Sequence, residues 1–213
     1  TPLSAIRSDG EMALFDPALS PDTAMRLKRI IASTDAATSS LASALALTRP
    51  ELSHPVSLSL RQSLDEAWMA LQPEAEKTGL VLRNEIPEAM RLVLDPYAVL
   101  IVMRNLVRNA IEHAAPATLT VGVGEEGCLR FADDGRGIPA QILPLVFERY
   151  YSHRRSDAGD PGITGGGPQD ARRGLGLAIA KRVCDLHRWR LSVESVHQGP
   201  SAGTTFTLCF LPR

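Results

Sequence analysis

The spacing of apolar residues changes at a proline-flanked segment, RPELSHP (49–55), and this change constrains the fold more than any other feature of the sequence. Before it, residues 23–48 keep a helical seam whose steps alternate between four and three residues. The seam positions are Leu27, Ile31, Thr34, Thr38, Leu41, Leu45 and Thr48. After it, strand-like and helix-like runs are mixed. Because proline stops a helix, we expect two domains, residues 1–50 and residues 51–213.

The first domain is expected to be a two-helix hairpin. Residues 1–15 carry a helical pattern, DPALSPD (16–22) is typical of a turn, and Asp22 is a candidate N-cap of the second helix. Two helices bury such a seam poorly by themselves, so the hairpin is expected to pair with a second copy into a dimeric four-helix bundle. The alternative is a hairpin that packs against its own second domain.

The second domain mixes strands and helices. Strand-like runs are expected at 56–60, 80–86, 91–95, 118–124, 128–134, 189–195 and 204–210, and helices at 63–79, 96–114 and 175–187. The first of these helices starts like a capping box and ends at Gly79, and Pro96 stands at the first position of the second. The pattern predicts an α+β chain whose second domain is an α/β sandwich, with a mixed sheet covered by helices on one face.

Charge and cysteine content narrow the classes of function. The formal net charge of −1 gives no indication of binding to nucleic acid or acidic lipid. Three widely spaced cysteines, Cys128, Cys184 and Cys209, indicate a reducing compartment, with neither a zinc site nor a disulfide framework. No apolar run reaches the roughly 18 residues of a membrane span. The chain starts inside a helical pattern without a methionine, so we expect a fragment of a longer protein, with any membrane segment upstream of it.

One glycine pattern is misleading. Gly122, Gly124 and Gly127 match the dinucleotide-binding spacing G-x-G-x-x-G after a predicted strand. The next run is a second strand, so no helix N-terminus stands there to hold a pyrophosphate. We therefore expect a hairpin turn at these glycines. The phosphate-binding pattern G-x-x-x-x-G-K-[ST] does not occur in the sequence.

Four separated motifs carry the chemistry. Asn105 and Asn109 lie one turn apart on the same face of the predicted central helix. DDGRGIP (133–139) places an aspartate after a strand, followed by glycines that allow close backbone approach. VFERYYSHRR (146–155) supplies aromatic and cationic groups before a glycine-rich stretch that is typical of a mobile loop. RRGLGLAI (172–179) places glycines at a helix start, where free N–H groups favour phosphate.

Together these motifs suit a nucleotide with a magnesium ion. A carboxylate accepts from the adenine amino group, glycine backbones and a helix end hold phosphates, and amide oxygens suit Mg²⁺. Asparagine is a poor helix former, because its side chain competes for backbone hydrogen bonds. We expect the two asparagines to be tolerated in the helix because they coordinate the metal.

The order and spacing of the four motifs resemble the ATP-binding domain of sensor histidine kinases, in the gyrase, heat-shock chaperone, kinase and mismatch-repair superfamily. The resemblance covers nearly the whole chain. TPLSAI (1–6) matches the segment after the phosphoacceptor histidine in the family pattern H-E-x-R-T-P-L, and residues 1–48 are similar to the dimerisation and phosphotransfer domain. The phosphoacceptor then falls four residues before Thr1, so this fragment is expected to bind ATP without phosphorylating itself.

The resemblance also implies site residues. Asn109 matches the main Mg²⁺ ligand with Asn105 supporting it, Asp133 matches the carboxylate that reads adenine, and His113 falls where a ring often lies against adenine. Thr1 takes the position of the threonine that orients water during dephosphorylation of the response regulator. The remaining implied nucleotide contacts are Gly135, Gly137, Ile138, Phe147, Arg149, Gly174, Leu175, Gly176, Gly203 and Thr204.

The implied function is that of the catalytic core of a two-component sensor histidine kinase. It transfers the γ-phosphoryl group of Mg-ATP in line to a histidine, and then to an aspartate on a response regulator. The implied cofactors are ATP and Mg²⁺. The implied partners are the cognate response regulator and a second copy of the hairpin, with no nucleic acid. The implied location is the cytoplasmic portion of a bacterial inner-membrane sensor.

Two other functions remain open. The ATP-hydrolysing members of the superfamily carry a glutamate four residues before the metal-binding asparagine, where this chain has Asn105, and this favours transfer over hydrolysis. A nucleotide-binding pseudokinase or scaffold is supported by Glu112, which occupies a position where the family often has a phosphate-facing lysine. Positive charge near the phosphates is then expected from arginines around the loop: Arg149, Arg154, Arg155, Arg172 and Arg173. At least one of the last four is expected to act in this way.

Overall fold

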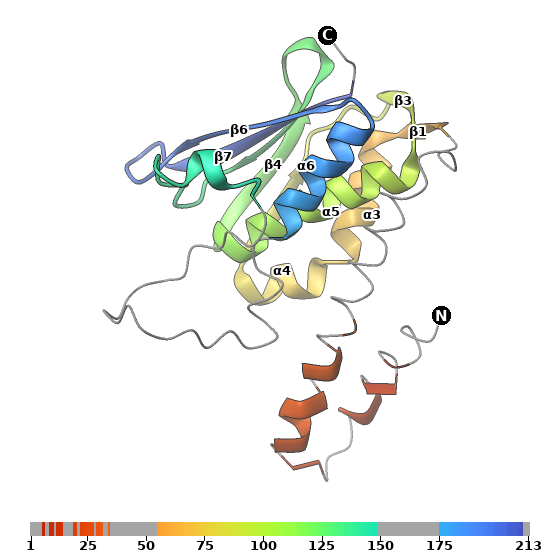
Figure 1. Ribbon diagram of the computed structural model, residues 1–213, viewed down its shortest axis with the longest axis vertical. Coiled ribbons are helices and arrows are strands. Elements are labelled where there is room, and N and C mark those ends of the chain that lie inside the picture. Colours follow the sequence, from red (N-terminus) through yellow and green to blue (C-terminus); the bar gives the residue numbers. More distant parts are fainter. Residues whose placement is uncertain are drawn as a thin grey trace.

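The computed structural model describes residues 55–148 and 175–210. Within the first fifty residues it describes residues 6, 9–10, 12–14, 19–20, 22–27, 29–31 and 34. A Cβ placed on Gly10 would lie 2.9 Å from Ile31 Cγ1, so these two residues are in contact. The contact joins the two segments of the predicted hairpin (Figure 1). Leu27 and Thr34 of the seam are also described, whereas Thr38, Leu41, Leu45 and Thr48 lie outside the described residues, and the four-helix bundle stays a prediction.

A mixed sheet forms the centre of the part of the chain after residue 55, as the sequence predicts, and it has five strands. The strand order is β2-β4-β5-β7-β6; β2 runs parallel to β4, and the other neighbours are antiparallel. In that order the strands span Leu80–Asn84, Ala117–Val123, Leu129–Asp133, Gly203–Cys209 and Arg190–Val196. A separate antiparallel pair consists of β1 (Val56–Ser59) and β3 (Arg91–Leu94).

Helices cover one face of this sheet, which confirms the predicted sandwich (Figure 1). They are α3 (Leu60–Met69), α4 (Gln72–Thr78), α5 (Pro96–His113) and α6 (Gly176–Leu186). α5 starts as predicted, because the Asp95 carboxylate caps it and Pro96 occupies its first turn. The N–H groups of Tyr97 and Ala98 donate to Asp95 Oδ1 at 2.8 and 3.2 Å. None of the described helices is long and apolar enough to cross a membrane.

Alternating side chains of β5, β7 and β6 pair into rows on the face that the helices cover. Two rows are apolar and belong to the main core: Leu129, Leu208 and Leu191, then Phe131, Phe206 and Val193. The next row along the strands is polar: Asp133, Thr204 and Ser195. The apolar core therefore ends at this polar row, next to the predicted adenine-reading carboxylate.

The helix predicted at 63–79 is instead two helices. α3 begins after Ser59, whose hydroxyl accepts from the N–H of Gln62 at 3.4 Å, so the cap lies four residues earlier than predicted. The chain turns at Ala70, and α4 begins with Pro73 in its first turn. Proline has no N–H to continue an α-helical ladder, which explains why one helix does not run through. The predicted terminal glycine is confirmed, since Gly79 ends α4 with φ 79°.

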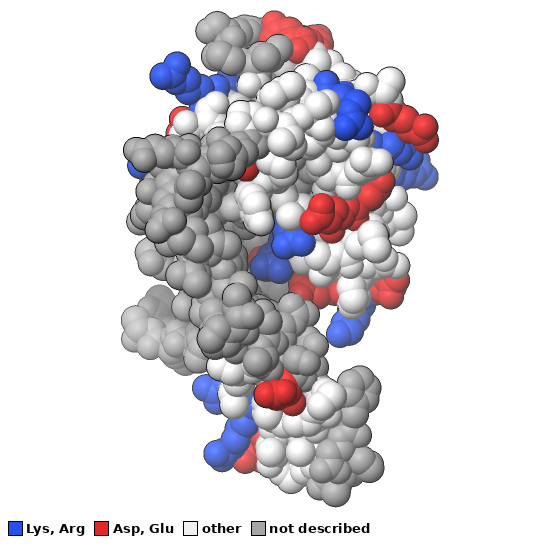
Figure 2. All heavy atoms as spheres, turned by 90° about the vertical axis from the view of Figure 1, so that its right-hand side faces the viewer, with Lys and Arg blue, Asp and Glu red and all other residues white. Residues whose placement is uncertain are grey.

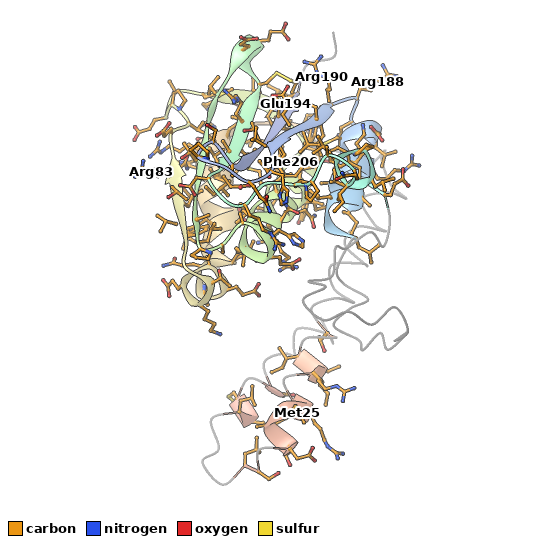
Figure 3. The ribbon with its side chains drawn as sticks, turned by 90° about the vertical axis from the view of Figure 1, so that its left-hand side faces the viewer. Met25, Arg83, Arg188, Arg190, Glu194 and Phe206 are labelled. Atoms are coloured by element: carbon orange, nitrogen blue, oxygen red, sulfur yellow. A yellow bond between two sulfur atoms is a disulfide. The ribbon has the colours of Figure 1, made fainter. Side chains whose placement is uncertain are left out.

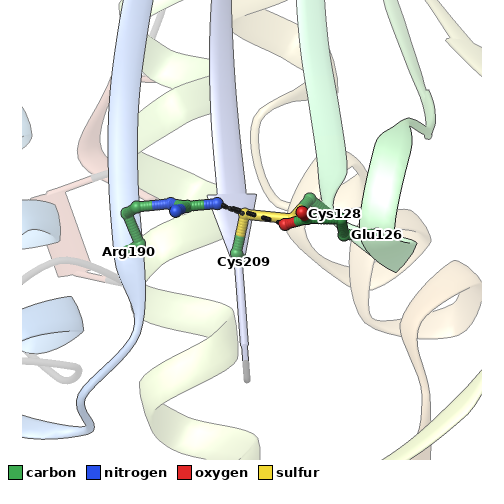
Figure 4. The surroundings of a disulfide bond; sticks show 4 residues. All are labelled: Glu126, Cys128, Arg190 and Cys209. Carbon is green, nitrogen blue, oxygen red and sulfur yellow. Dashed lines mark hydrogen bonds and ion pairs between the residues drawn. A yellow bond between two sulfur atoms is a disulfide. The ribbon is translucent and has the colours of Figure 1, made fainter. Parts of the chain in front are cut away.

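The predicted absence of a disulfide is wrong. Cys128 and Cys209 form a disulfide bond, with their Cα atoms 4.4 Å apart (Figure 4). They flank the cross-strand pair of Leu129 and Leu208, so they stand opposite each other on β5 and β7. Their sequence separation of 81 conceals this, because spacing along a chain does not report cross-strand neighbours. Cys184 is free and buried, and burial raises the pKa of its thiol to about 12.

The expectation of a hairpin at the misleading glycines is confirmed. β4 and β5 are antiparallel neighbours joined by a short 3-10 turn, η2 (Glu125–Gly127). The N–H of Gly124 donates to the Cys128 carbonyl at 2.8 Å and closes the turn. Gly127 has φ 74°, a left-handed conformation that favours glycine.

Charges of both signs are mixed on the described surface. Figure 2 shows Lys and Arg side chains interspersed with Asp and Glu side chains on one face of the molecule. Ion pairs also occur on the described surface, such as that between Lys181 Nζ and Asp185 Oδ1 at 2.7 Å. The pattern agrees with the formal net charge of −1 and points to local contacts, not a long-range field, as the source of any charge-based recognition on that face.

Candidate functional site

The polar row consists of Asp133, Thr204 and Ser195, which are direct cross-strand neighbours on β5, β7 and β6. Thr204 is 5% exposed, and the other two side chains are half-buried. Polar groups at such depth need hydrogen-bond partners, so their mutual bonds decide what they can offer a ligand.

Asp133 has one oxygen engaged and one oxygen available. Its Oδ1 accepts from the N–H of Gly135 at 3.0 Å and from the N–H of Thr204 at 3.2 Å. Within the described residues, no hydrogen bond reaches Oδ2. Burial raises the pKa of the Asp133 carboxyl, and the bonds from Gly135 and Thr204 lower it in part. The carboxylate is thus fixed in orientation and can accept one more donor.

The two glycines of the DDGRGIP motif are both required by close packing. A Cβ on Gly135 would lie 2.7 Å from the Cα atom of Ala114, at the C-terminal end of α5. Gly137 has φ 71°, and a Cβ there would overlap the Val196 carbonyl at the end of β6. A loop that follows Asp133 is therefore held between α5 and β6, which brings the end of α5 next to the carboxylate.

The two asparagines have different surroundings. Asn105 Nδ2 donates to the Ile101 carbonyl at 2.8 Å, one turn back along α5. Its Oδ1 lies close to the start of α6, where a Cβ on Gly176 would be 2.9 Å away. Asn109 is half-buried one turn further on, and its side chain makes no hydrogen bond to any described residue. Its amide oxygen is therefore the more available of the two, and the division between a main and a supporting Mg²⁺ ligand stays a prediction.

The start of α6 offers backbone donors. Leu175 occupies its N-cap position and has an apolar side chain that accepts no hydrogen bond, and Gly176 is the first helical residue. An uncapped first turn leaves N–H groups and the positive end of the helix dipole for an anion. Because Gly176 touches Asn105, this helix start lies beside the asparagine face of α5.

Three further predicted positions lie around these elements. Phe147 packs on the core, with its ring edge toward Phe206 at a centroid distance of 6.3 Å. His113 is in the last turn of α5, and its Nε2 lies 3.9 Å from Glu112 Oε2. Ile138 donates its N–H to the hydroxyl of Ser195 at 2.8 Å. Phe206, labelled in Figure 3, thus joins the aromatic residue of the third motif to the sheet.

Some predicted residues lie outside the described part of the chain. These are Thr1, Arg149 and Gly174, together with the other arginines proposed to supply charge: Arg154, Arg155, Arg172 and Arg173. Their roles stay predictions.

Sequence reasoning missed Ser195 and Asp134. Ser195 Oγ contacts Ile138, Gly203 and Thr204, and so connects the glycine loop to two strands. The signal available was alternation, since Leu191, Val193 and Ser195 share the inward register of the predicted last strands. Asp134 Oδ1 accepts from the N–H of Thr118 at 2.6 Å and fixes the loop from its other side.

The donor set around a cation is restricted. In the described ranges, no group of three or more His, Cys, Asp or Glu residues is placed to hold a metal ion. Mg²⁺ does not require such a group, because it is commonly bound by few protein oxygens together with water and substrate phosphates. The amide oxygen of Asn109 is a hard ligand that fits it.

Comparisons with known proteins give a matching family model and several relatives. A family model described as histidine kinase-, DNA gyrase B-, and HSP90-like ATPase matches residues 94–213. The signal transduction histidine-protein kinase AfsQ2 of Streptomyces coelicolor is 32% identical over 117 residues, which cover 54% of this chain and 19% of that protein. The sensor histidine kinase YkoH of Bacillus subtilis is 34% identical over 132 residues, which cover 61% and 26%. The chain therefore spans about a fifth to a quarter of the length of these relatives.

Solved structures share the fold. The catalytic domain of histidine kinase ThkA superposes with a TM-score of 0.54 at 19% identity, over 72% of this chain and 93% of that one. The Acinetobacter baumannii histidine kinase AdeS superposes with a TM-score of 0.62 at 14% identity, over 98% of this chain and 95% of that one. At such identities the likeness concerns architecture, and function has to be argued from the site.

Proposed function

Because the chain belongs to the family of histidine kinase-, DNA gyrase B-, and HSP90-like ATPases, we propose that it is the ATP-binding catalytic domain of a two-component sensor histidine kinase. The observation that best supports this proposal is a pair of hydrogen-bond acceptors that no described residue uses. Asp133 Oδ2 receives no hydrogen bond from a described residue, and neither does the amide oxygen of Asn109. The contact of Gly135 with Ala114 brings the two elements that carry these acceptors together.

The proposed mechanism rests on positioning. Asp133 accepts a hydrogen bond from the exocyclic amino group of adenine, and the first turn of α6 orients the phosphates through backbone N–H groups. Asn109 contributes an amide oxygen to the cation, while the bond from Asn105 to Ile101 holds Asn105 against the start of α6. Bound Mg²⁺ supplies charge neutralisation on the phosphate oxygens.

The proposed reaction is an in-line phosphoryl transfer. The bond between the γ-phosphorus and the bridging oxygen breaks, a bond from phosphorus to an imidazole nitrogen forms, and ADP leaves. Most of the catalysis then comes from orientation and from charge stabilisation. The proposal places the accepting histidine on the dimerisation hairpin, just ahead of Thr1 in the family pattern. From there the group passes to an aspartate of a cognate response regulator, with Thr1 assisting the reverse dephosphorylation.

The proposed setting follows from the same family. The hairpin within residues 1–50 joins two copies of the protein, and residues 51–213 form the catalytic domain. We place the chain in the cytoplasmic portion of a bacterial inner-membrane sensor, with contact to the membrane only through segments outside this chain.

Hydrolysis of ATP by water is less well supported than transfer. Position 105 carries an amide whose nitrogen donates to the Ile101 carbonyl, so it offers no base to activate water. A pseudokinase remains the second candidate because of Glu112, which is 42% exposed beside His113. A phosphorylation assay separates the two, since a pseudokinase binds nucleotide without forming phosphohistidine.

The proposal is tested by calorimetric titration with a non-hydrolysable ATP analogue, with and without Mg²⁺. Asn109→Ala is expected to weaken binding of the Mg²⁺ complex about tenfold and to leave metal-free binding nearly unchanged. Equal binding of the Mg²⁺ complex by the variant and the wild-type chain would remove the proposed role of Asn109. A chain extended by H-E-x-R ahead of Thr1 is then expected to form phosphohistidine from ATP. Binding without phosphohistidine would favour the pseudokinase.

A further inference from the structure

The hydroxyl of Ser195 makes three contacts with residues of two other segments. It receives the N–H of Ile138 at 2.8 Å, it lies 2.8 Å from the carbonyl oxygen of Gly203, and it lies 3.0 Å from the hydroxyl of Thr204. The segments are the glycine loop after β5 and the first two residues of β7. One side chain on β6 thus connects the loop to the neighbouring strand.

The chemistry of the partners fixes the direction of each bond. A hydroxyl has one proton to donate and two lone pairs to accept with. The carbonyl of Gly203 only accepts, so the Ser195 proton points to it. The N–H of Ile138 only donates, so it uses one lone pair. The contact with Thr204 must then use the second lone pair, which makes Thr204 the donor.

This assignment determines what Thr204 offers a ligand. With its proton directed at Ser195, Thr204 Oγ1 presents only lone pairs to any other partner. Thr204 is also the direct cross-strand neighbour of Asp133, and its N–H donates to Asp133 Oδ1. Asp133 Oδ2, when ionised, likewise presents only lone pairs. The polar row therefore offers hydrogen-bond acceptors and no side-chain donor next to the carboxylate.

We propose that Ser195 is a specificity-determining positioning residue, which holds the Thr204 hydroxyl as an acceptor so that the site selects a purine with a 6-amino group over one with a 6-oxo group. This inference rests on the proposed ATP binding and deepens it. Adenine presents an amino donor at this position, whereas guanine and hypoxanthine present a carbonyl acceptor. An acceptor row facing a carbonyl leaves both sides without a donor, which is the more costly arrangement for buried groups.

Removing the Ser195 hydroxyl changes this arrangement in a definite direction. Without it, the proton of Thr204 loses its acceptor and the Thr204 hydroxyl is released to rotate. A rotated hydroxyl donates to a 6-oxo purine as readily as it accepts from a 6-amino purine. Ser195→Ala is therefore expected to reduce the preference for adenine, and not only to weaken binding in general.

The test is the ratio of dissociation constants for GDP and ADP, and for IDP and ADP, measured by calorimetry. Ser195→Ala is expected to reduce both ratios about tenfold. Ser195→Thr retains a hydroxyl and is expected to keep the wild-type ratios. Ser192→Ala is the matched control, because Ser192 is on the same strand but on the opposite, exposed face. Ser192→Ala is expected to leave every dissociation constant unchanged.

Outcomes separate this inference from the proposed function. Ser195→Ala with weaker binding but unchanged ratios would overturn the inference and leave ATP binding intact. A wild-type chain that binds none of the three nucleotides would overturn the proposed function and the inference with it. If Ser195→Ala does not fold, Ser195→Cys provides the test, since the thiol is a weaker donor and acceptor of similar size. Its ratios are expected to fall between those of the wild type and unity, and wild-type ratios would overturn the inference.

Discussion

The two ends of the β5-β7-β6 sheet region differ in what their side chains leave available. At one end, on the face covered by helices, the polar row presents acceptors at Asp133 and Thr204 that no described residue uses. At the other end, on the opposite face, Cys128 and Cys209 are bonded to each other, and Arg190 Nη2 lies 3.3 Å from Cys209 Sγ (Figure 4). The first end therefore has acceptors available to a ligand, whereas the side chains at the second end bond to one another.

In this sheet, the residues that would bind a ligand and the disulfide that stabilises the fold lie at opposite ends of the same strands. Strands run continuously from the cysteine end to the polar row, over the five residues of β5 from Leu129 to Asp133. Figure 3 labels Arg190 at one end and Phe206 nearer the middle of the sheet. Changes at the cysteine end should therefore alter unfolding but not nucleotide affinity, and changes at the polar row should alter nucleotide affinity.

Removing the disulfide should produce the largest effect. The bond closes a loop with a sequence separation of 81, and the chain-entropy relation assigns a loop of that size a contribution of about 4.5 kcal/mol to stability. The double variant Cys128→Ser, Cys209→Ser is expected to lose about that much free energy of unfolding in urea, with ADP affinity unchanged. A reductant should lower the free energy of unfolding of the wild type by a similar amount and leave that of the double variant unchanged. Changed ADP affinity in the folded double variant would contradict the separation of the two ends.

Neutralising Asp133 should lower nucleotide affinity and not stability, in contrast to removal of the disulfide. Asp133→Asn keeps an oxygen that accepts from Gly135 and Thr204 but replaces the free oxygen with a donor group. ADP affinity is expected to fall about 100-fold, equivalent to about 2.7 kcal/mol, while thermal stability is retained. Asp134→Asn is the matched control, because it keeps the acceptor for Thr118 and is expected to bind ADP normally. Normal ADP binding by Asp133→Asn would contradict its role.

The pH dependence of binding should report Asp133. Burial raises the pKa of this carboxyl above its ordinary value, so it takes up a proton at a higher pH than an exposed aspartate does. ADP affinity is therefore expected to fall as pH is lowered through that raised pKa, since a protonated carboxyl is a poorer acceptor. Titrations between about pH 4 and pH 7 measure this, and Asp133→Asn corrects for ionisation of the nucleotide. Equal pH profiles for both proteins would contradict it.

The stability that depends on the Asp133 carboxyl should change with pH in the opposite direction to ADP affinity. Because the folded protein holds the Asp133 proton more tightly than the unfolded chain, the linked stability is present below the unfolded pKa. It is lost as pH rises through the higher folded pKa. Comparing urea unfolding of the wild type and Asp133→Asn across this window measures the difference, and a wild type that gains stability relative to the variant as pH rises would contradict it.

Arg190 should have the smallest effect. Its guanidinium lies 3.6 Å from Glu126 Oε2, and both side chains are about half exposed, at 48% and 52%. Exposed ion pairs of this kind contribute about 0.5 kcal/mol. Arg190→Gln is expected to lower the free energy of unfolding by about that amount, with no change in ADP affinity. Arg188→Gln, labelled nearby in Figure 3, is the control and is expected to have no measurable effect. A loss above about 2 kcal/mol would show that Arg190 supports the disulfide end more than an exposed pair can.

The sequence revealed those parts of the site that depend on local spacing. Asp133 with its two glycines, and the asparagines one turn apart, are recognisable because each motif lies within one short segment. The alternation of β6 even directs Ser195 inward. The proposed role of Ser195 was not predictable, because this role depends on the strand register that places Ser195 opposite Thr204. The assembled sheet decides that register.

The errors have the same physical origin. Cys128 and Cys209 are 81 residues apart in sequence and meet only because β5 and β7 are neighbours. The helix at 63–79 was expected to be continuous, because its apolar spacing does not reveal the turn at Ala70 before Pro73. Periodicity thus identified the elements, while pairing between distant strands and the break within a helix required the folded structure.

The most direct test of the account is an amide chemical-shift titration of the chain with Mg-ADP. If nucleotide binds at the polar row, large shifts are expected for the N–H groups of Gly135, Ile138 and Thr204 and for the side-chain amide of Asn109. Small shifts are expected at Cys128 and its neighbours in the β4–β5 hairpin. Shifts concentrated in that hairpin, or an absence of shifts around Asp133 at saturating nucleotide, would contradict the assignment of the binding site to the polar row.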